Sequence, residues 1–175
     1  MRKITAPATA ILIVCTALFQ LIALHLFAIG GIRPDILFSL VIFFALFGGP
    51  GMGVRSGAII GLVRDIAGAD IFGVNIFILA TAGFILEKIR TNFYRESSIT
   101  HVLMVGSAYL VSTSVHYLLV YGIPGMTSIY VGCAPDFYTF FTRSALPSSV
   151  YTAVLSAFLF RYLMRLFDLR ETSLI

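Results

Sequence analysis

The stretch RPDILFSLVIFFALFGGPGMGVRSGAIIGLVRDIAGADIFGVN, residues 33–75, decides the fold of this chain. It combines regularly spaced glycines with charged side chains in a strongly apolar setting. Gly53, Gly57 and Gly61 are four residues apart, which places them along one side of a helix, and Asp65 continues the same line. The stretch also contains the charged residues that a lipid-embedded segment normally lacks: Arg33, Asp35, Arg64 and Asp65.

The composition of the whole chain indicates a membrane protein. Of its 175 residues, 59% are hydrophobic and 11% are charged, whereas about a quarter of the residues in a soluble domain are charged. One small core cannot bury so much apolar surface, so lipid must cover much of it. The net charge of +4 does not favour nucleic acid as a partner. No long linker and no repeat of fixed period divides the chain, and we predict a single domain over residues 1–175.

Hydropathy predicts an all-α, polytopic bundle of six transmembrane helices. A spanning helix needs about twenty mainly apolar residues. Glycine- and proline-rich turns separate apolar runs at residues 48–51 and 122–125, and a polar connection is expected over residues 87–98. The predicted spans cover approximately residues 7–29, 34–47, 52–66, 74–86, 100–121 and 147–164.

The third predicted span is weak because it contains Arg55, Arg64 and Asp65, and charge bias decides whether it crosses. If it crosses and the N-terminus is cytoplasmic, nine of the 12 Lys and Arg residues lie on the cytoplasmic side. If it does not cross, the basic residues after the fourth span and those of the tail move outside. The positive-inside rule therefore favours six spans with both the N- and C-termini in the cytoplasm.

Charged residues inside a membrane are expected to face the bundle interior and to have partners. In this topology Arg33, Asp35 and Asp65 share the outer half of the membrane. Asp65 could pair with Arg33, or Asp35 with Arg64, and the sequence leaves both pairings open. Such a pair either fixes how helices meet or belongs to a proton relay or ligand site. We favour the first role, because an ion pair can specify register without chemistry.

The glycines of the third predicted span favour close helix packing. Small residues at four-residue spacing let another backbone approach, and Asp65 would then meet the neighbouring helix. After residue 125 the outer loop is aromatic, and Pro135-Asp136 predicts the start of a short interfacial helix. This helix would serve either as part of an aromatic belt or as a docking surface.

Sequence motifs for catalysis are lacking. There is no H-E-x-x-H zinc motif and no phosphate-binding Gly-Lys loop, and residues 53–57 do not form a G-x-S-x-G elbow. Cys15 and Cys133 are expected at different depths, which argues against a disulfide or a metal site. His25 and His116 are expected to pack through hydrogen bonds. We therefore expect no catalytic activity, no metal and no cofactor.

Three elements, taken in order, resemble the bacterial rod shape-determining protein MreD family. Arg33-Pro34-Asp35 opens a short apolar helix, Gly57-x-x-x-Gly61-x-x-x-Asp65 follows, and Phe72-Gly73-Val74-Asn75 opens the next helix. The size and the six predicted spans are also similar. The motif positions in this chain are Pro34, Asp35, Gly57, Gly61, Asp65 and Gly73, and the wider set of expected polar and packing residues adds Arg33, Gly53, Arg64 and Asn75.

The resemblance implies a multi-pass protein of the bacterial inner (plasma) membrane that acts without catalysis in the machinery that elongates the lateral cell wall. It also implies a fold similar to the substrate-binding subunits of energy-coupling-factor vitamin transporters. The implied partners are the single-span protein MreC, MreB filaments, the glycosyltransferase RodA and a class B penicillin-binding protein. The alternative is a substrate-binding subunit of a vitamin-type transporter, although no A-x-x-x-A coupling face of the kind expected lies within the first predicted span, residues 7–29.

Overall fold

The computed structural model describes residues 16, 32–68, 71–93, 98–122 and 136–167, and the regular elements among them are all helices. The all-α class is therefore confirmed for this part of the chain. Apart from residue 16, the first predicted span lies outside the described residues, as do Cys15, His25 and Cys133. The helices are α2 (Ile36–Phe47), α3 (Met52–Ala67), α4 (Val74–Phe93), α5 (Ser98–Tyr121), α6 (Phe137–Phe140) and α7 (Leu146–Leu166).

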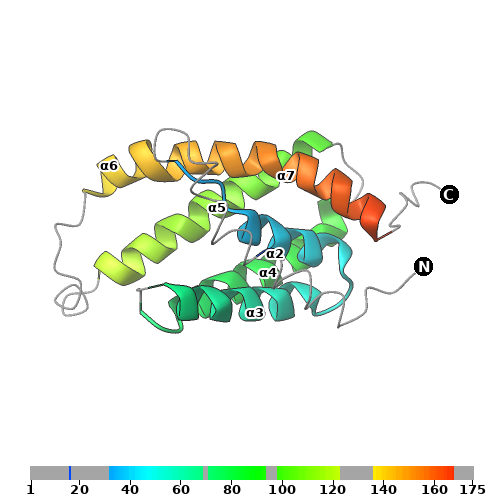
Figure 1. The fold of residues 1–175 in the computed structure, drawn as a ribbon, viewed down its shortest axis with the longest axis horizontal. Coiled ribbons are helices and arrows are strands. Elements are labelled where there is room, and N and C mark those ends of the chain that lie inside the picture. The colour runs from blue at the N-terminus through cyan, green and yellow to red at the C-terminus, as the bar shows by residue number, and fades with distance from the viewer. Residues whose placement is uncertain (1–15, 17–31, 69–70, 94–97, 123–135, 168–175) are drawn as a thin grey trace.

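Helix α2 is the centre of the bundle. In Figure 1 it lies between the α3–α4 pair and the long helix formed by α6 and α7, and it contacts α3, α4, α5 and α7. Its sequence, ILFSLVIFFALF, is apolar on every side, and such a helix must be covered on every side. Every residue from Leu37 to Leu46 is buried.

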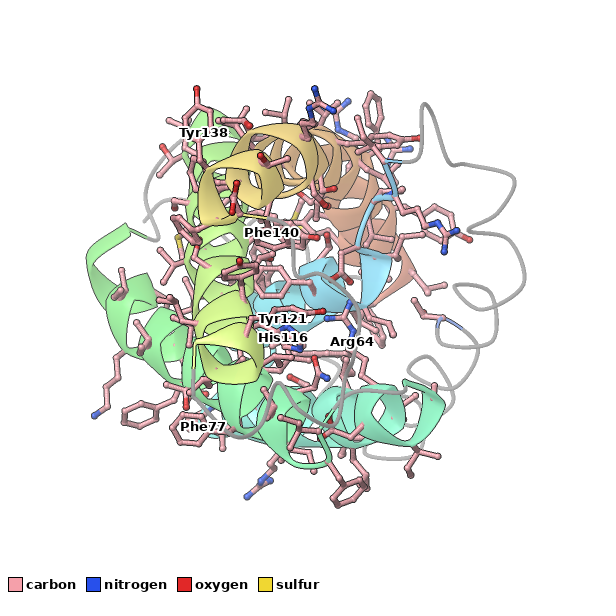
Figure 2. The ribbon with its side chains drawn as sticks, turned by 90° about the vertical axis from the view of Figure 1, so that its left-hand side faces the viewer. Arg64, Phe77, His116, Tyr121, Tyr138 and Phe140 are labelled. Atoms are coloured by element: carbon pink, nitrogen blue, oxygen red, sulfur yellow. The ribbon has the colours of Figure 1, made fainter. Side chains whose placement is uncertain are left out.

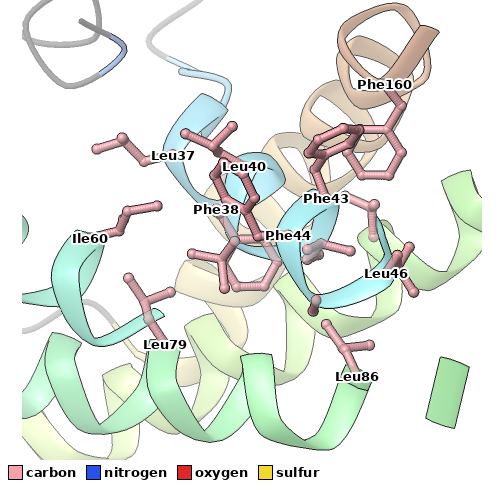
Figure 3. Close-up of a cluster of buried hydrophobic side chains, with 14 of the residues drawn as sticks. Leu37, Phe38, Leu40, Phe43, Phe44, Leu46, Ile60, Leu79, Leu86 and Phe160 are labelled. Carbon is pink, nitrogen blue, oxygen red and sulfur yellow. The ribbon is translucent and has the colours of Figure 1, made fainter. Parts of the chain in front are cut away.

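The aromatic residues of α2 organise the core around it. Phe43 contacts Phe160 of α7, with ring centroids 5.6 Å apart, and Phe38 meets the ring of Tyr109 of α5 edge-on at 5.3 Å. Figure 3 shows Ile60 of α3 and Leu79 of α4 facing the same cluster from the other side. In a membrane, where lipid tails are as apolar as these side chains, such contacts stabilise the bundle through van der Waals packing.

Helices α3 and α4 form an antiparallel hairpin with closely packed backbones. Gly53 faces Gly83, Gly57 faces Leu79 and Ala80, and Gly61 faces Asn75 and Ile76. A Cβ atom built on any of the three α3 glycines would lie closer than 3.0 Å to backbone atoms of α4. The α3 glycines are therefore the reason that the two backbones can touch.

Two predicted boundaries are wrong. The polar connection was expected from residue 87, yet α4 continues to Phe93. Glu87 stays helical because its carboxylate has partners within the hairpin, as described below. The aromatic segment after Asp136 is also not a separate interfacial helix: α6 passes through a π-helical turn, Phe141–Ala145, directly into α7.

Among the described residues, one helical segment has both the length and the apolarity to cross a membrane, Thr100–Tyr121 of α5. Helix α2 is more apolar than α5 but has only 12 residues. The charged residues of α3 and α4 lower their hydropathy. The count of six spans stays a prediction.

The helix ends place chemically different groups at the two ends of the bundle. At one end the ring of His101, near the start of α5, meets Phe47 of α2 and Phe160 of α7. The antiparallel order brings the start of α3 and the ends of α4 and α7 to this end, with most of the described Lys and Arg residues. At the other end Tyr117 of α5 stacks on Phe140 of α6 with centroids 4.6 Å apart.

Candidate functional site

Asp65 caps the N-terminus of the neighbouring helix α4. Its carboxylate accepts hydrogen bonds from the backbone N–H groups of Gly73 (2.9 Å), Asn75 (3.2 Å) and Ile76 (3.2 Å). The side-chain amide of Asn75 donates a fourth hydrogen bond, at 3.0 Å. The first turn of a helix leaves such N–H groups without partners, and a negative charge there also interacts favourably with the helix dipole. The buried carboxylate thus fixes where α4 starts relative to the end of α3.

Asp35 joins three helices. Its side chain accepts from the N–H of Phe38 at 2.9 Å, which caps α2, and its backbone N–H donates to the hydroxyl of Thr152 in α7 at 3.0 Å. Its second carboxylate oxygen accepts a hydrogen bond from the guanidinium of Arg64 in α3, which forms an ion pair. Of the two pairings that the sequence left open, the structure contains this one.

Arg33 and Pro34 occupy different environments beside this pair. Arg33 is exposed, and Pro34 is buried immediately before the cap of α2. Asp65 interacts with α4 rather than with Arg33. The structure thus brings Asp35 together with Arg64, and Asp65 together with Gly73 and Asn75, as two adjoining polar clusters.

Glu87 is a counterpart of Asp65 that hydropathy did not reveal. Its carboxylate accepts from the backbone N–H groups of Gly51 (2.6 Å) and Gly53 (3.1 Å), so it caps α3 from the far end of α4. Each helix of the hairpin therefore supplies, near its own C-terminus, the carboxylate that caps the other.

The two caps follow one spacing in the sequence. Gly51 and Asp65 are fourteen residues apart, as are Gly73 and Glu87, and a glycine lies four residues before each acid. Gly51 has φ +74° and Gly73 has φ +99°, values that favour glycine. The matching spacing places one carboxylate cap at each end of the hairpin.

A polar cavity of about 310 Å³ opens beside these clusters. Arg64 and His116 line it, and Figure 2 shows both near the middle of the bundle, with Phe77 on the outside of α4. Sequence patterns did not assign Tyr109 to this site; Ser112, Thr113 and His116, three, four and seven residues after it, lie on the same helix face and are the signal that could have found it. The cavity is lined by Asp35, Phe38, Arg64, Asn75, Ile78, Tyr109, Ser112, Thr113 and His116.

The described polar side chains of this region make hydrogen bonds that hold helices and turns in place. The hydroxyl of Ser56 donates to the carbonyl groups of its own helix, at 2.7 Å to Met52 and 3.1 Å to Gly53. Both buried aspartates accept hydrogen bonds from fixed partners. Within the described ranges, no group of three or more His, Cys, Asp or Glu residues could hold a metal ion.

Comparison with known proteins gives one match. The family model of the rod shape-determining protein MreD matches residues 1–170, nearly the whole chain. No curated protein and no solved structure matches it. The likeness to energy-coupling-factor transporter subunits therefore stays a prediction.

Proposed function

Because the chain belongs to the rod shape-determining MreD family of membrane proteins, we propose that it is a non-enzymatic scaffold of the bacterial elongation machinery in the inner membrane. In this role it forms a complex with MreC and acts with MreB, RodA and a class B penicillin-binding protein. The observation that carries the proposal is that the carboxylates in the described helices accept hydrogen bonds that hold helices together. Asp35, Asp65 and Glu87 each hold helices in register, which suits a rigid docking body.

The proposed architecture has six spans with both termini in the cytoplasm, as in the vitamin-transporter subunits. The distribution of charge within the described helices supports it. Arg55, Lys88, Arg90 and Arg161 belong to the end of the bundle that would face the cytoplasm, and the aromatic contacts of Tyr117 belong to the opposite end. Labelling of single cysteines from either side of the membrane tests this arrangement. Modification of residue 88 from outside the cell would contradict it.

Depletion of the protein in a rod-shaped host tests the cellular role. We expect the cells to become round and lose viability as lateral wall synthesis fails, and we expect the wild-type gene to restore rods. Unchanged rods after complete depletion would exclude the proposal. Co-purification tests the molecular role separately: a single-span coiled-coil partner is the expected companion of the scaffold.

The second candidate function is that of a substrate-binding transporter subunit, and the polar cavity beside Arg64 is the observation that favours it. Cavities of roughly 300–1,000 Å³ are typical of small-molecule sites. Recovery of a bound vitamin together with a pair of ATPase subunits would support this function over the scaffold.

A further inference from the structure

The last turns of helix α7 carry two exposed arginines, Arg161 and Arg165. Within the part of the chain that the structure describes, neither of them forms a hydrogen bond or an ion pair. Arg64 differs from them, because its guanidinium pairs with Asp35. A guanidinium has five N–H donors in a planar fork, which matches the oxygen atoms of a phosphate or carboxylate. The arginine pair therefore suits an anionic ligand group.

Both arginines lie on one face of α7, about one helical turn apart. Their separation of four residues corresponds to about 6 Å along the helix axis, so both guanidinium groups can reach one lipid head group. Phe158 and Tyr162 lie on the same face, because all four positions fall within roughly 100° of the helix circumference. The side chain of Phe158 is 70% exposed and that of Tyr162 is 66% exposed. The cationic pair thus adjoins an exposed aromatic pair.

The exposed apolar surface continues along α7 away from the arginines. Leu146, Val150 and Val154 precede Phe158 at four-residue spacing and are exposed as well. From Leu146 to Phe158 this surface extends over roughly 18 Å of helix, which exceeds the approximately 15 Å depth of one leaflet's hydrocarbon region. Hydrocarbon chains cover such a surface in a membrane, whereas an acidic peptide in the cytoplasm would contact only the arginines. A ligand that covers both parts needs an anionic head attached to hydrocarbon chains.

We propose that Arg161 and Arg165 bind the phosphate head of one anionic phospholipid, whose hydrocarbon chains lie against Phe158 and the apolar face of α7. Charge complementarity with the arginine pair and the continuity of that pair with the exposed apolar face carry this assignment. In the proposed orientation the lipid belongs to the cytoplasmic leaflet, where anionic lipids attract basic side chains near the surface. Only the choice of leaflet rests on that orientation. Binding itself depends neither on the scaffold role nor on a protein partner.

Native mass spectrometry of the delipidated full-length protein in a neutral maltoside detergent tests the proposal. The probes are dioleoyl phosphatidylglycerol, dioleoyl phosphatidylcholine with the same chains and a zwitterionic head, and glycerol phosphate as the head alone. We expect one phosphatidylglycerol to stay bound, while the other two probes bind at least roughly tenfold more weakly. Equal retention of the two lipids would overturn the proposal and leave the arginine pair to an acidic protein segment. Displacement of phosphatidylglycerol by glycerol phosphate would also overturn it, in favour of a soluble anion.

Two double variants locate the bound lipid. Arg161→Gln with Arg165→Gln removes both guanidinium groups from exposed positions, and we expect phosphatidylglycerol binding to weaken roughly tenfold while the thermal unfolding midpoint stays the same. Arg55→Gln with Arg90→Gln is the matched control. It removes the same charge from the same end of the bundle, but from the α3–α4 hairpin, which lies across α2 from α7 (Figure 1). Binding by the control should equal that of the parent protein. An equal loss in both double variants would mean general attraction to the basic end and would exclude this site.

Discussion

Helices α3 and α4 meet in a different way from helices α5 and α7. In the first pair, backbone contacts backbone, and a Cβ atom on Gly57 would lie 2.6 Å from the carbonyl carbon of Leu79. In the second pair, a Cβ atom on Gly106 of α5 would find its nearest neighbour, the Cβ of Ala153, at 3.4 Å. Side-chain contacts can adjust by small rotations, whereas backbone contacts cannot. We therefore expect the α3–α4 hairpin to be the more rigid part of the bundle and the α5–α7 pair the more adaptable part.

The two helix pairs also differ in how their polar side chains form hydrogen bonds. Reciprocal carboxylate caps from Asp65 and Glu87 lock both ends of the hairpin. On α7 two buried serines bond instead to their own helix: Ser149 donates to the carbonyl of Leu146 at 2.7 Å, and Ser156 donates to that of Ala153 at 2.6 Å. Bonds of this kind satisfy the hydroxyl groups without setting the register of the neighbouring helix. A partner or ligand that needs a fixed surface would find it on the hairpin.

The largest expected effect is that of Gly57→Val. Its branched side chain must enter space occupied by the backbone of Leu79 and Ala80, so the two helices would have to separate. We expect a loss of about 3 kcal/mol or more in the free energy of unfolding. Circular dichroism at rising temperature measures it in detergent, since the chain has no tryptophan to report unfolding. An unchanged midpoint would remove the distinction between the two helix pairs.

Asp65→Ala should have the next largest effect. It leaves three backbone N–H groups at the start of α4 without their acceptor, and each unsatisfied buried donor costs about 1–3 kcal/mol, although water can recover part of this. We expect a net loss of about 2–3 kcal/mol. Asp65→Asn keeps one acceptor oxygen and should lose less, which separates loss of the cap from loss of volume. Equal midpoints for Asp65→Ala and the parent would leave the cap without a role in stability.

Much of the hairpin could be predicted from the sequence, and the reason is physical. Glycines at four-residue spacing have few uses in a membrane helix other than close packing, and an acid at the end of their line must find donors. The sequence alone does not decide the partner of Asp35, because the helix rise places Arg33 and Arg64 at nearly the same depth in the membrane. Glu87 was assigned to a connection because hydropathy treats any charged residue as the end of a span. Its spacing after Gly83, equal to that of Asp65 after Gly61, is the signal that could have identified it.

Glu87→Ala tests whether the two ends of the hairpin are equivalent. Glu87 makes two backbone hydrogen bonds and is only partly buried, whereas Asp65 makes four hydrogen bonds and is buried. Water can replace Glu87 at the start of α3 more easily. We expect a loss of about 1 kcal/mol in thermal unfolding experiments, smaller than that of Asp65→Ala. A larger loss for Glu87→Ala would show that the α3 end controls the hairpin.

Gly106→Ala should have the smallest effect, and it supplies the control for Gly57. Both residues are helical glycines, so alanine raises helix propensity equally at the two positions, by roughly 1 kcal/mol. At residue 106 the new methyl group meets the Cβ of Ala153 at the near edge of ordinary contact, and a shift of a few tenths of an ångström accommodates it. We therefore expect the unfolding midpoint to stay the same or rise, whereas Gly57→Ala lowers it. If the two alanine variants changed stability alike, the rigidity of the hairpin would come from its caps alone, and the glycines would reflect only composition.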